Sequence, residues 1–273
     1  LIGEWGLADV EIHTLWGTSV EALTTEQTAR LRDALAERRL RVAALDSTAF
    51  LRCHLRGGQP PESWSKRFHS VAGNFDQHLA LLGRCLETAR LLDAPLVRVF
   101  GFWGDGELSE AIIEEIAGRL AGAASLAAQC GIALALENCP HSYLPHTRHA
   151  LRVLRLVNSP HLRLLWDPSN AYRSGESDVA DLARDVMPYL AHVHVKGVTL
   201  YATATRGREY VVIEQGAVDY YRLLGTLHAE GYTGVVSLEP HYALPKGGIE
   251  GAARESFASL RRIVGAISQT SAS

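Results

Sequence analysis

Short apolar runs rich in β-forming residues alternate with longer stretches of helical periodicity along nearly the whole chain. The pattern predicts strands over residues 9–16, 40–47, 95–102, 132–138, 162–168, 190–197 and 234–240. It predicts helices over residues 75–95, 109–131, 149–157, 178–188, 217–230 and 249–266. Because strands that alternate with helices build parallel sheets with right-handed crossovers, the chain is expected to have an α/β fold.

Two architectures fit this alternation, an open doubly wound sheet and a closed (β/α)8 barrel. No glycine-rich phosphate loop follows an early strand, which disfavours a dinucleotide-binding sheet. Polar side chains end four different strands, at Glu137, Asp167, His194 and Glu239. A barrel brings such strand ends together at one mouth. We therefore predict a single-domain (β/α)8 TIM barrel over residues 1–266.

The barrel prediction leaves one strand unassigned, because only seven strands are convincing. The eighth is either a first strand that is missing from the chain or the run at 210–214, and the first explanation is preferred. Residues 267–273 are predicted to form a disordered tail, since they are small and polar.

Composition narrows the class of protein. The 273 residues carry a net charge of −3 and are 47% hydrophobic, which gives no reason to expect nucleic acid or an anionic membrane as a partner. No apolar run is long enough to span a membrane. The four cysteines have no metal-binding or disulfide pattern, so we expect reduced thiols in a cytoplasmic protein. A homo-oligomer is left open.

The strand-end residues suggest a metal site. Three carboxylates at adjacent strand ends repel one another unless a cation lies between them, and a neutral imidazole can complete the set of ligands. Three oxygen ligands and one nitrogen form a hard site, which favours Mn²⁺ and leaves Mg²⁺, Co²⁺ and Zn²⁺ as alternatives. The sequence therefore predicts one divalent metal bound by Glu137, Asp167, His194 and Glu239.

The segments ALENCP, LLWDPSNAY, HVHVKG and VVSLEPH, in this order, resemble the xylose isomerase-like TIM barrels of the sugar phosphate isomerase/epimerase superfamily. The resemblance implies the same four metal ligands and makes Glu137 and Glu239 the catalytic acid/base pair. Two positions depart from the usual pattern. Asn170 stands where epimerases often have histidine, and Gly197 stands where aspartate often follows the lysine.

The resemblance also implies an activity. The expected enzyme is an isomerase or epimerase of a ketose or related carbohydrate, which acts by proton transfer through a metal-bound enediolate. The same site could instead serve a dehydratase or lyase of an inosose or dehydroshikimate type, or the barrel could be a non-catalytic subunit. The sequence does not separate these alternatives.

Further residues are candidates for binding the small-molecule substrate. Lys196 and His241 share a strand face with the predicted ligands, although an ion pair or a solvated rim position would also explain them. Asn170 could bind substrate, orient a ligand or cap a helix. His192 lies one layer deeper than His194, where a supporting role beside the metal ligands is expected.

Three more candidates follow strands or lie in loops. Trp16 and Trp103 could stack on a sugar, although ordinary packing is the more common role of such aromatic residues. Arg206 lies in the loop after the HVHV strand, where the resemblance implies a substrate-binding arginine; a solvated charge is the alternative. The segment 51–74 is too long for a simple connection and is predicted to cover the mouth as a lid.

Overall fold

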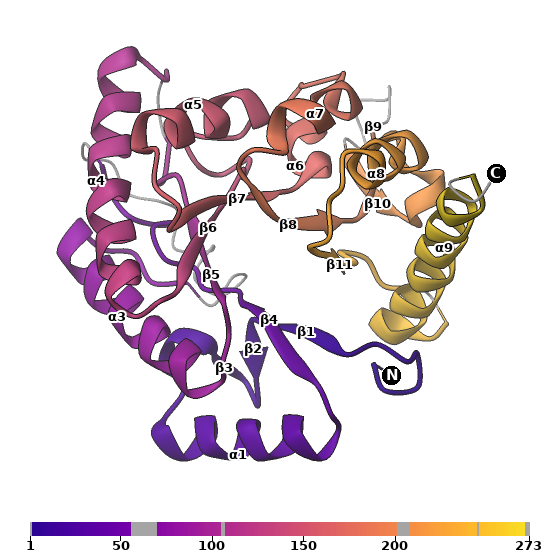
Figure 1. Ribbon diagram of the computed structural model, residues 1–273, viewed down its shortest axis with the longest axis horizontal. Coiled ribbons are helices and arrows are strands. Elements are labelled where there is room, and N and C mark those ends of the chain that lie inside the picture. Colours follow the sequence, from indigo (N-terminus) through magenta and orange to yellow (C-terminus); the bar gives the residue numbers. More distant parts are fainter. Residues whose placement is uncertain (1, 56–69, 105–106, 201–207, 245, 271–273) are drawn as a thin grey trace.

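The computed structural model describes residues 2–55, 70–104, 107–200, 208–244 and 246–270. Its main sheet runs in the order β1 (Asp9–Ile12), β4 (Arg41–Leu45), β5 (Leu96–Phe100), β6 (Ala133–Glu137), β7 (Leu162–Trp166), β8 (Leu190–Val195) and β11 (Val235–Leu238). Every neighbouring pair is parallel. The strands curve into a nearly closed barrel with helices around it (Figure 1), which confirms the predicted α/β TIM-barrel class.

The helices around the barrel are α1 (Thr25–Glu37), α3 (Phe75–Leu91), α4 (Glu110–Gln129), α5 (Thr147–Val157), α6 (Pro168–Arg173), α7 (Ala183–Val186), α8 (Tyr220–Ala229) and α9 (Gly248–Thr270). Short 3₁₀ turns lie at η1 (Val20–Ala22), η2 (Val179–Leu182) and η3 (Ile213–Gln215). Several helices begin where a side chain satisfies their first backbone N–H groups. Thr24 and Asn74 each form a reciprocal capping box, at the start of α1 and α3.

All seven predicted barrel strands are present, but the first is shorter than expected. β1 ends at Ile12, and the following residues form a small antiparallel hairpin of β2 (Thr14–Leu15) and β3 (Thr18–Ser19). Trp16 has a φ of 52° and Gly17 a φ of 76°, so the two residues form the tight turn of this hairpin.

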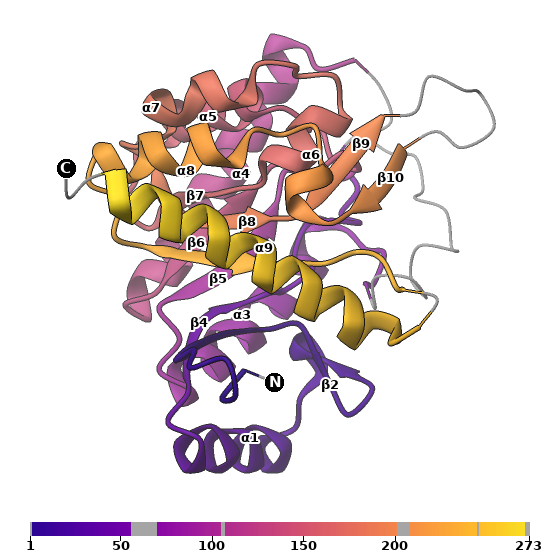
Figure 2. The same ribbon diagram turned by 90° about the vertical axis from the view of Figure 1, so that its right-hand side faces the viewer.

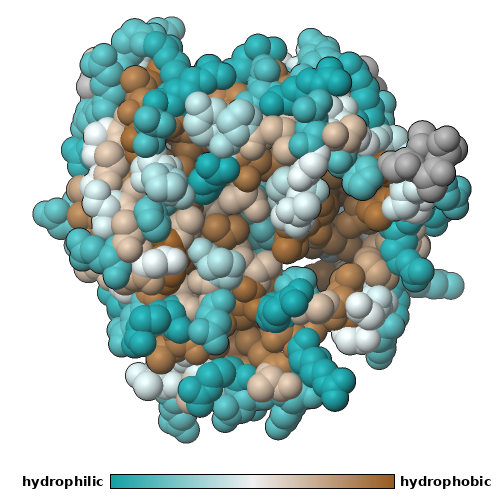
Figure 3. Space-filling model, in the orientation of Figure 1, coloured by the Kyte–Doolittle hydropathy of each residue, from teal (hydrophilic) through white to brown (hydrophobic). Residues whose placement is uncertain are grey.

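The unassigned eighth position lies between β1 and β11, the two edges of the sheet, which are not hydrogen-bonded to each other in the described part of the chain. The run at 210–214 does not fill it. Residues Arg208–Val211 form β10, which pairs antiparallel with β9 (Gly197–Leu200) outside the barrel. The two edges and α9 line an apolar groove of about 400 Å³. Apolar side chains also surround a hollow on the face shown in Figure 3.

The helices differ from the sequence predictions at both ends of the chain. Helix α1 was not predicted, because only Thr28 and Leu31 are buried in it and its apolar signal is therefore weak. Helix α9 continues to Thr270, four residues beyond the predicted end at residue 266. Ile267 packs against the core and explains the extension. No helix in the described residues is long and apolar enough to cross a membrane.

Candidate active site

The four predicted metal ligands meet at one end of the barrel. Glu137 ends β6, Asp167 follows β7, His194 lies near the end of β8, and Glu239 follows β11. Glu137, Asp167 and His194 present ligand atoms that all lie within 4.8 Å of one another. Oε2 of Glu239 lies 3.5 Å from Nδ1 of His194. The barrel topology therefore places these side chains, far apart in sequence, around a common point.

Two buried atoms at this point are suited to bind a cation. Nδ1 of His194 has no hydrogen-bond partner among the described residues, and Oδ2 of Asp167 is paired with the ammonium group of Lys196. The other oxygen of Asp167 accepts a hydrogen bond of 2.8 Å from the backbone N–H of Asn170, so Asp167 also caps α6. A buried polar atom without a partner is costly, and a cation at this point would satisfy Nδ1 of His194 and could replace Lys196 at Oδ2 of Asp167.

The other ring nitrogen of His194 contacts Glu11, which sequence reasoning missed. Nε2 of His194 lies 3.1 Å from both carboxylate oxygens of Glu11. Burial alone would raise the pKa of Glu11, but His194 and His192 outweigh it and lower that pKa below its ordinary value. Nδ1 faces Glu137 and Glu239. Burial opposes protonation of His194, but Glu11 and Glu239 raise its pKa well above its ordinary value, so a metal at Nδ1 would have to displace a proton while Glu11 keeps the one on Nε2.

His192 lies beside this pair, as a supporting residue would. Its Nε2 is 2.7 Å from Oε1 of Glu11 and 2.9 Å from the hydroxyl of Ser237. The side chain is buried and does not line the cavity described below. It therefore contacts the residue that holds His194 and not the cavity itself.

Glu137 is held by two donors. Arg98 donates to its Oε2 over 3.1 Å, and Asn170 donates to its Oε1 over 2.9 Å. Burial raises the pKa of Glu137 to about 7, although Arg98 and His194 oppose the shift. Arg98 also lies 3.6 Å from Asp46, another buried carboxylate. Asn170 thus orients a predicted ligand, one of the roles expected for it.

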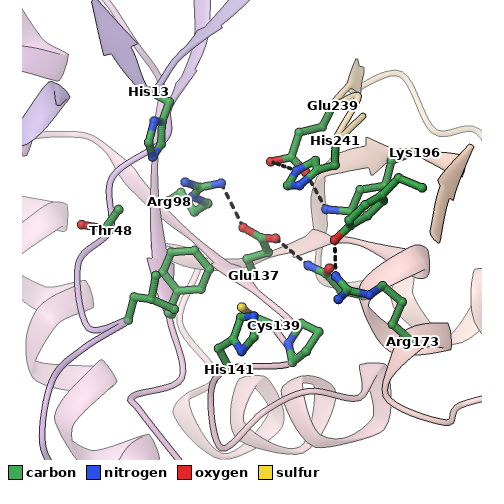
Figure 4. Close-up of a pocket in the computed structure, with 15 residues that line it drawn as sticks. His13, Thr48, Arg98, Glu137, Cys139, His141, Arg173, Lys196, Glu239 and His241 are labelled. Atoms are coloured by element: carbon green, nitrogen blue, oxygen red, sulfur yellow. Dashed lines mark hydrogen bonds and ion pairs between the residues drawn. The ribbon is translucent and has the colours of Figure 1, made fainter. Parts of the chain in front are cut away.

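Lys196 bridges the remaining two carboxylates. Its Nζ lies 2.5 Å from Oδ2 of Asp167. The same Nζ lies 2.6 Å from Oε2 of Glu239 (Figure 4). Burial would raise the pKa of Glu239, but Lys196 and His194 hold it well below its usual range. Nε2 of His241 lies 3.2 Å from Oε1 of Glu239. Lys196 and His241 therefore contact the predicted ligands directly.

The acids at the mouth outnumber the permanent cations that pair with them. Five carboxylates lie around the strand ends, on Glu11, Asp46, Glu137, Asp167 and Glu239. Their permanently charged partners are Arg98 and Lys196. In the absence of a metal, burial opposes protonation of His194, but Glu11 and Glu239 raise its pKa well above its ordinary value, so a proton on its ring offsets part of this excess. A cation that kept the carboxylates ionised and His194 neutral would have three negative charges to compensate. This excess, together with Nδ1 of His194, makes the donor set suitable for a divalent cation.

A cavity of about 280 Å³ opens above these residues. Glu137, Lys196, Glu239 and His241 form part of its wall, and Figure 4 shows them turned toward a shared space. Its other lining residues are His13, Thr48, Leu51, Arg98, Phe100, Cys139, Pro140, His141, Asn170, Arg173 and Tyr210.

The two tryptophans expected to stack on substrate do not line this cavity. Trp16 is 47% exposed in the turn between β2 and β3, where the Arg30 guanidinium lies 4.5 Å from its ring. Trp103 joins His54 and Ser142 through backbone bridges. Packing and turn formation explain both positions. Arg206 and most of the predicted lid at 51–74 lie outside the described residues.

Gly197, which departs from the family pattern, has a structural reason. A Cβ atom at this position would lie 2.2 Å from the backbone oxygen of Val211 and 2.5 Å from that of Val212. The β9–β10 hairpin begins at this point and projects from one end of the barrel (Figure 2). An aspartate side chain therefore does not fit here in this conformation.

Sequence reasoning missed four charged residues of the site: Glu11, Asp46, Arg98 and Arg173. Asp46 follows β4 directly, so the signal used for Asp167 could have identified it. Glu11 lies within DVEIH and Arg98 within LVRVF, where a single charge interrupts an apolar strand. The same signal identified His194, so it could have identified both. Arg173 ends a short helix after Asp167 and carries no such signal.

Comparisons with known proteins identify the family to which this barrel belongs. A family model described as xylose isomerase-like TIM barrel matches residues 1–263. No curated protein matches the chain in sequence.

Solved structures share the fold at low sequence identity. A xylose isomerase-like TIM barrel protein from Mycobacterium smegmatis, in complex with magnesium, is 17% identical with a TM-score of 0.70, covering 97% of this chain and 87% of that one. The probable 3-DHS dehydratase AsbF from Bacillus anthracis is 19% identical with a TM-score of 0.71, covering 95% and 90%. The 3-keto-D-glucoside 4-epimerase YcjR from E. coli is 18% identical with a TM-score of 0.70, covering 96% and 91%. The chain belongs to the xylose isomerase-like TIM barrel family.

Proposed function

We propose that this protein is a divalent-metal-dependent isomerase or epimerase of a ketose or a related hydroxy-carbonyl sugar. The observation that carries the proposal is the convergence of Glu137, Asp167, His194 and Glu239 on a buried, acid-rich point at the floor of a small cavity. Structural neighbours named as a 3-keto-D-glucoside 4-epimerase and as a probable 3-DHS dehydratase support a reaction of this general class.

The four converging residues would hold the cation, with Mn²⁺ favoured by the predominance of oxygen ligands. When bound, a divalent cation supplies Lewis acidity that lowers the pKa of a proton on a carbon next to a carbonyl group. Lys196 would have to loosen its contact with Asp167 or Glu239 to make room, since its ammonium group neutralises both.

Proton transfer falls to the two glutamates. Glu137 comes from β6 and Glu239 from the end of β11, and both approach Nδ1 of His194, at 4.0 and 3.5 Å. One carboxylate removes the proton from carbon, and the other returns a proton to the opposite face or to the adjacent carbon. Arg98, Asn170 and His241 hold the two carboxylates in place.

Proton exchange tests the proposal. Protein stripped of metal and reloaded with Mn²⁺ is incubated in D₂O with a panel of ketoses, inososes and dehydroshikimate, and carbon-bound protons are followed by NMR. We expect metal-dependent deuterium incorporation next to the carbonyl of at least one compound. Glu137→Gln and Glu239→Gln should each reduce exchange at least 100-fold, whereas the exposed control Glu230→Gln should leave it unchanged.

Other outcomes distinguish the alternatives. Loss of water with a new enone would identify a dehydratase and contradict isomerisation. Absence of exchange with every compound, in protein that binds Mn²⁺, would favour a non-catalytic barrel. Full activity in Glu239→Gln would show that the site is misplaced.

A further inference from the structure

Arg173 lies in the cavity wall on the substrate side of the predicted catalytic residues. It is the last residue of α6, one helical turn after Asn170, whose side chain bonds Glu137. Figure 4 shows the Arg173 side chain reaching into the space below Lys196 and His241. A ligand that approaches Glu137 and Glu239 would therefore pass close to this guanidinium group.

Arg173 differs from the other permanent cations of the cavity because no described carboxylate pairs with it. Arg98 contacts Asp46 and Glu137. Lys196 contacts two further acids. The only hydrogen bond of Arg173 in the described residues goes to the hydroxyl of Tyr210, a neutral group. Its Nε is buried without a hydrogen-bond partner.

Tyr210 fixes the position of this unpaired charge. The Arg173 guanidinium lies 4.9 Å from the centroid of the Tyr210 ring, and that ring lies 4.9 Å from the ring of His241. The guanidinium is thus held by a ring and a hydroxyl instead of an acid. A partly buried cation without a counter-charge is costly, so this arrangement is suited to a ligand that brings the negative charge.

We infer that Arg173 binds a carboxylate group of the substrate, so that the substrate is a keto acid of the sugar type. This inference rests on the proposed function, which places the carbonyl end of the same molecule at Glu137 and Glu239. A planar guanidinium matches a carboxylate in shape and in charge. A single cation without a described carboxylate partner, in a cavity of about 280 Å³, suits one carboxylate better than a doubly charged phosphate.

Binding measurements test the inference separately from turnover. Calorimetry with the Mn²⁺-loaded protein compares D-fructose, 2-keto-D-gluconate and 5-keto-D-gluconate, because fructose is the neutral counterpart of the two keto acids. At least one keto acid should bind about 10- to 100-fold more tightly than fructose, the ratio expected for a charge-assisted hydrogen bond. Arg173→Gln should abolish this ratio and leave fructose affinity within about twofold.

Two further variants serve as controls, because Arg173→Gln could lose the preference by perturbing the fold. Arg173→Lys keeps the charge and should retain part of the preference, and Arg155→Gln, on the exposed side of α5, should retain all of it. Equal affinity for fructose and both keto acids, or an unchanged ratio in Arg173→Gln, would overturn the inference.

Deuterium exchange measured on the same samples reports separately on the proposed function. Exchange without any preference for the keto acids would overturn only the role of Arg173. A preference for the keto acids without exchange would overturn only the proposed function.

Discussion

At the scale of single residues, the two ring nitrogens of His194 have different surroundings. Nε2 is held by the Glu11 carboxylate, and Nδ1 faces the acids of the mouth without a hydrogen bond. A carboxylate that holds the distal N–H of a histidine fixes its tautomer and ring orientation and makes the other nitrogen a better ligand. Glu11 is therefore expected to support metal binding without touching the metal.

Substitution of Glu11 by Gln tests this role. The amide keeps the shape of the side chain but removes its charge, so His194 is held less firmly. We expect the Kd for Mn²⁺, measured by calorimetry, to rise about 10- to 100-fold, while circular dichroism shows an intact fold. Glu37→Gln, in the exposed last turn of α1, serves as the matched control. An unchanged Kd in Glu11→Gln would show that Glu11 only fills space in the barrel.

Some residues of the site could be predicted from the sequence and others could not. The position of Glu137, Asp167, His194 and Glu239 at the ends of apolar strands was enough to predict that they lie close together, because strand ends meet in a barrel. The partners of these residues could not be predicted in the same way. The bridge from Lys196 to two acids depends on side-chain conformations that only the packed barrel determines.

At the scale of elements, the β9–β10 hairpin carries Tyr210 to the cavity and depends on a close backbone approach at Gly197. We expect Gly197→Ala to destabilise the protein by about 1–3 kcal/mol, because the added Cβ would meet the Val211 carbonyl oxygen. A lower melting temperature in thermal unfolding would support this. Gly118→Ala, in α4 with no atom within 4 Å of the added Cβ, should be neutral or stabilising. Equal melting temperatures for the two variants would contradict the account.

A buried hydrogen bond links α3 to the segment that follows β4. Nδ1 of His78 accepts a hydrogen bond of 3.0 Å from the backbone N–H of Phe50, a buried residue with a φ of 67°. Burial lowers the pKa of His78 to about 4. The unfolded chain therefore binds a proton below pH about 6.5, whereas the folded protein does not until pH about 4.

This lowered pKa of His78 determines how the stability of the protein changes with pH. The unfolding free energy should fall as the pH decreases from about 6.5 to about 4, by at most about 3 kcal/mol from His78 alone. Denaturant unfolding of wild type and of His78→Gln across this range isolates the contribution, since glutamine can accept the same hydrogen bond without titrating. Parallel stability curves for the two proteins would exclude His78 as the cause.

The elements themselves were predicted unevenly. Strong apolar periodicity identified the seven barrel strands and helices such as α3 and α4. Helix α1 and the end of α9 were missed, because few of their positions are buried and their sequences resemble solvated segments. The β9–β10 hairpin was not predicted either, since its position depends on contacts with η3 and α6 and not on its own pattern.

At the scale of the whole molecule, seven parallel strands bring residues separated by more than a hundred positions to one end of the barrel (Figures 1 and 4). The strand order follows the chain order, and the alternating pattern predicted the architecture once the polar residues at four strand ends had favoured a barrel over an open sheet. The uncompensated charge at the mouth is a property of the assembled barrel, because it appears only when the acids of several strands are brought together.

The central claim is that a single divalent cation compensates these converging acids. Anomalous diffraction from crystals grown with Mn²⁺ tests it most directly. We predict one peak per chain within about 2.0–2.4 Å of ligand atoms of Glu137, Asp167, Nδ1 of His194 and Glu239, with the Lys196 ammonium displaced from at least one carboxylate. No peak at saturating Mn²⁺, with Lys196 still bridging Asp167 and Glu239, would contradict the claim.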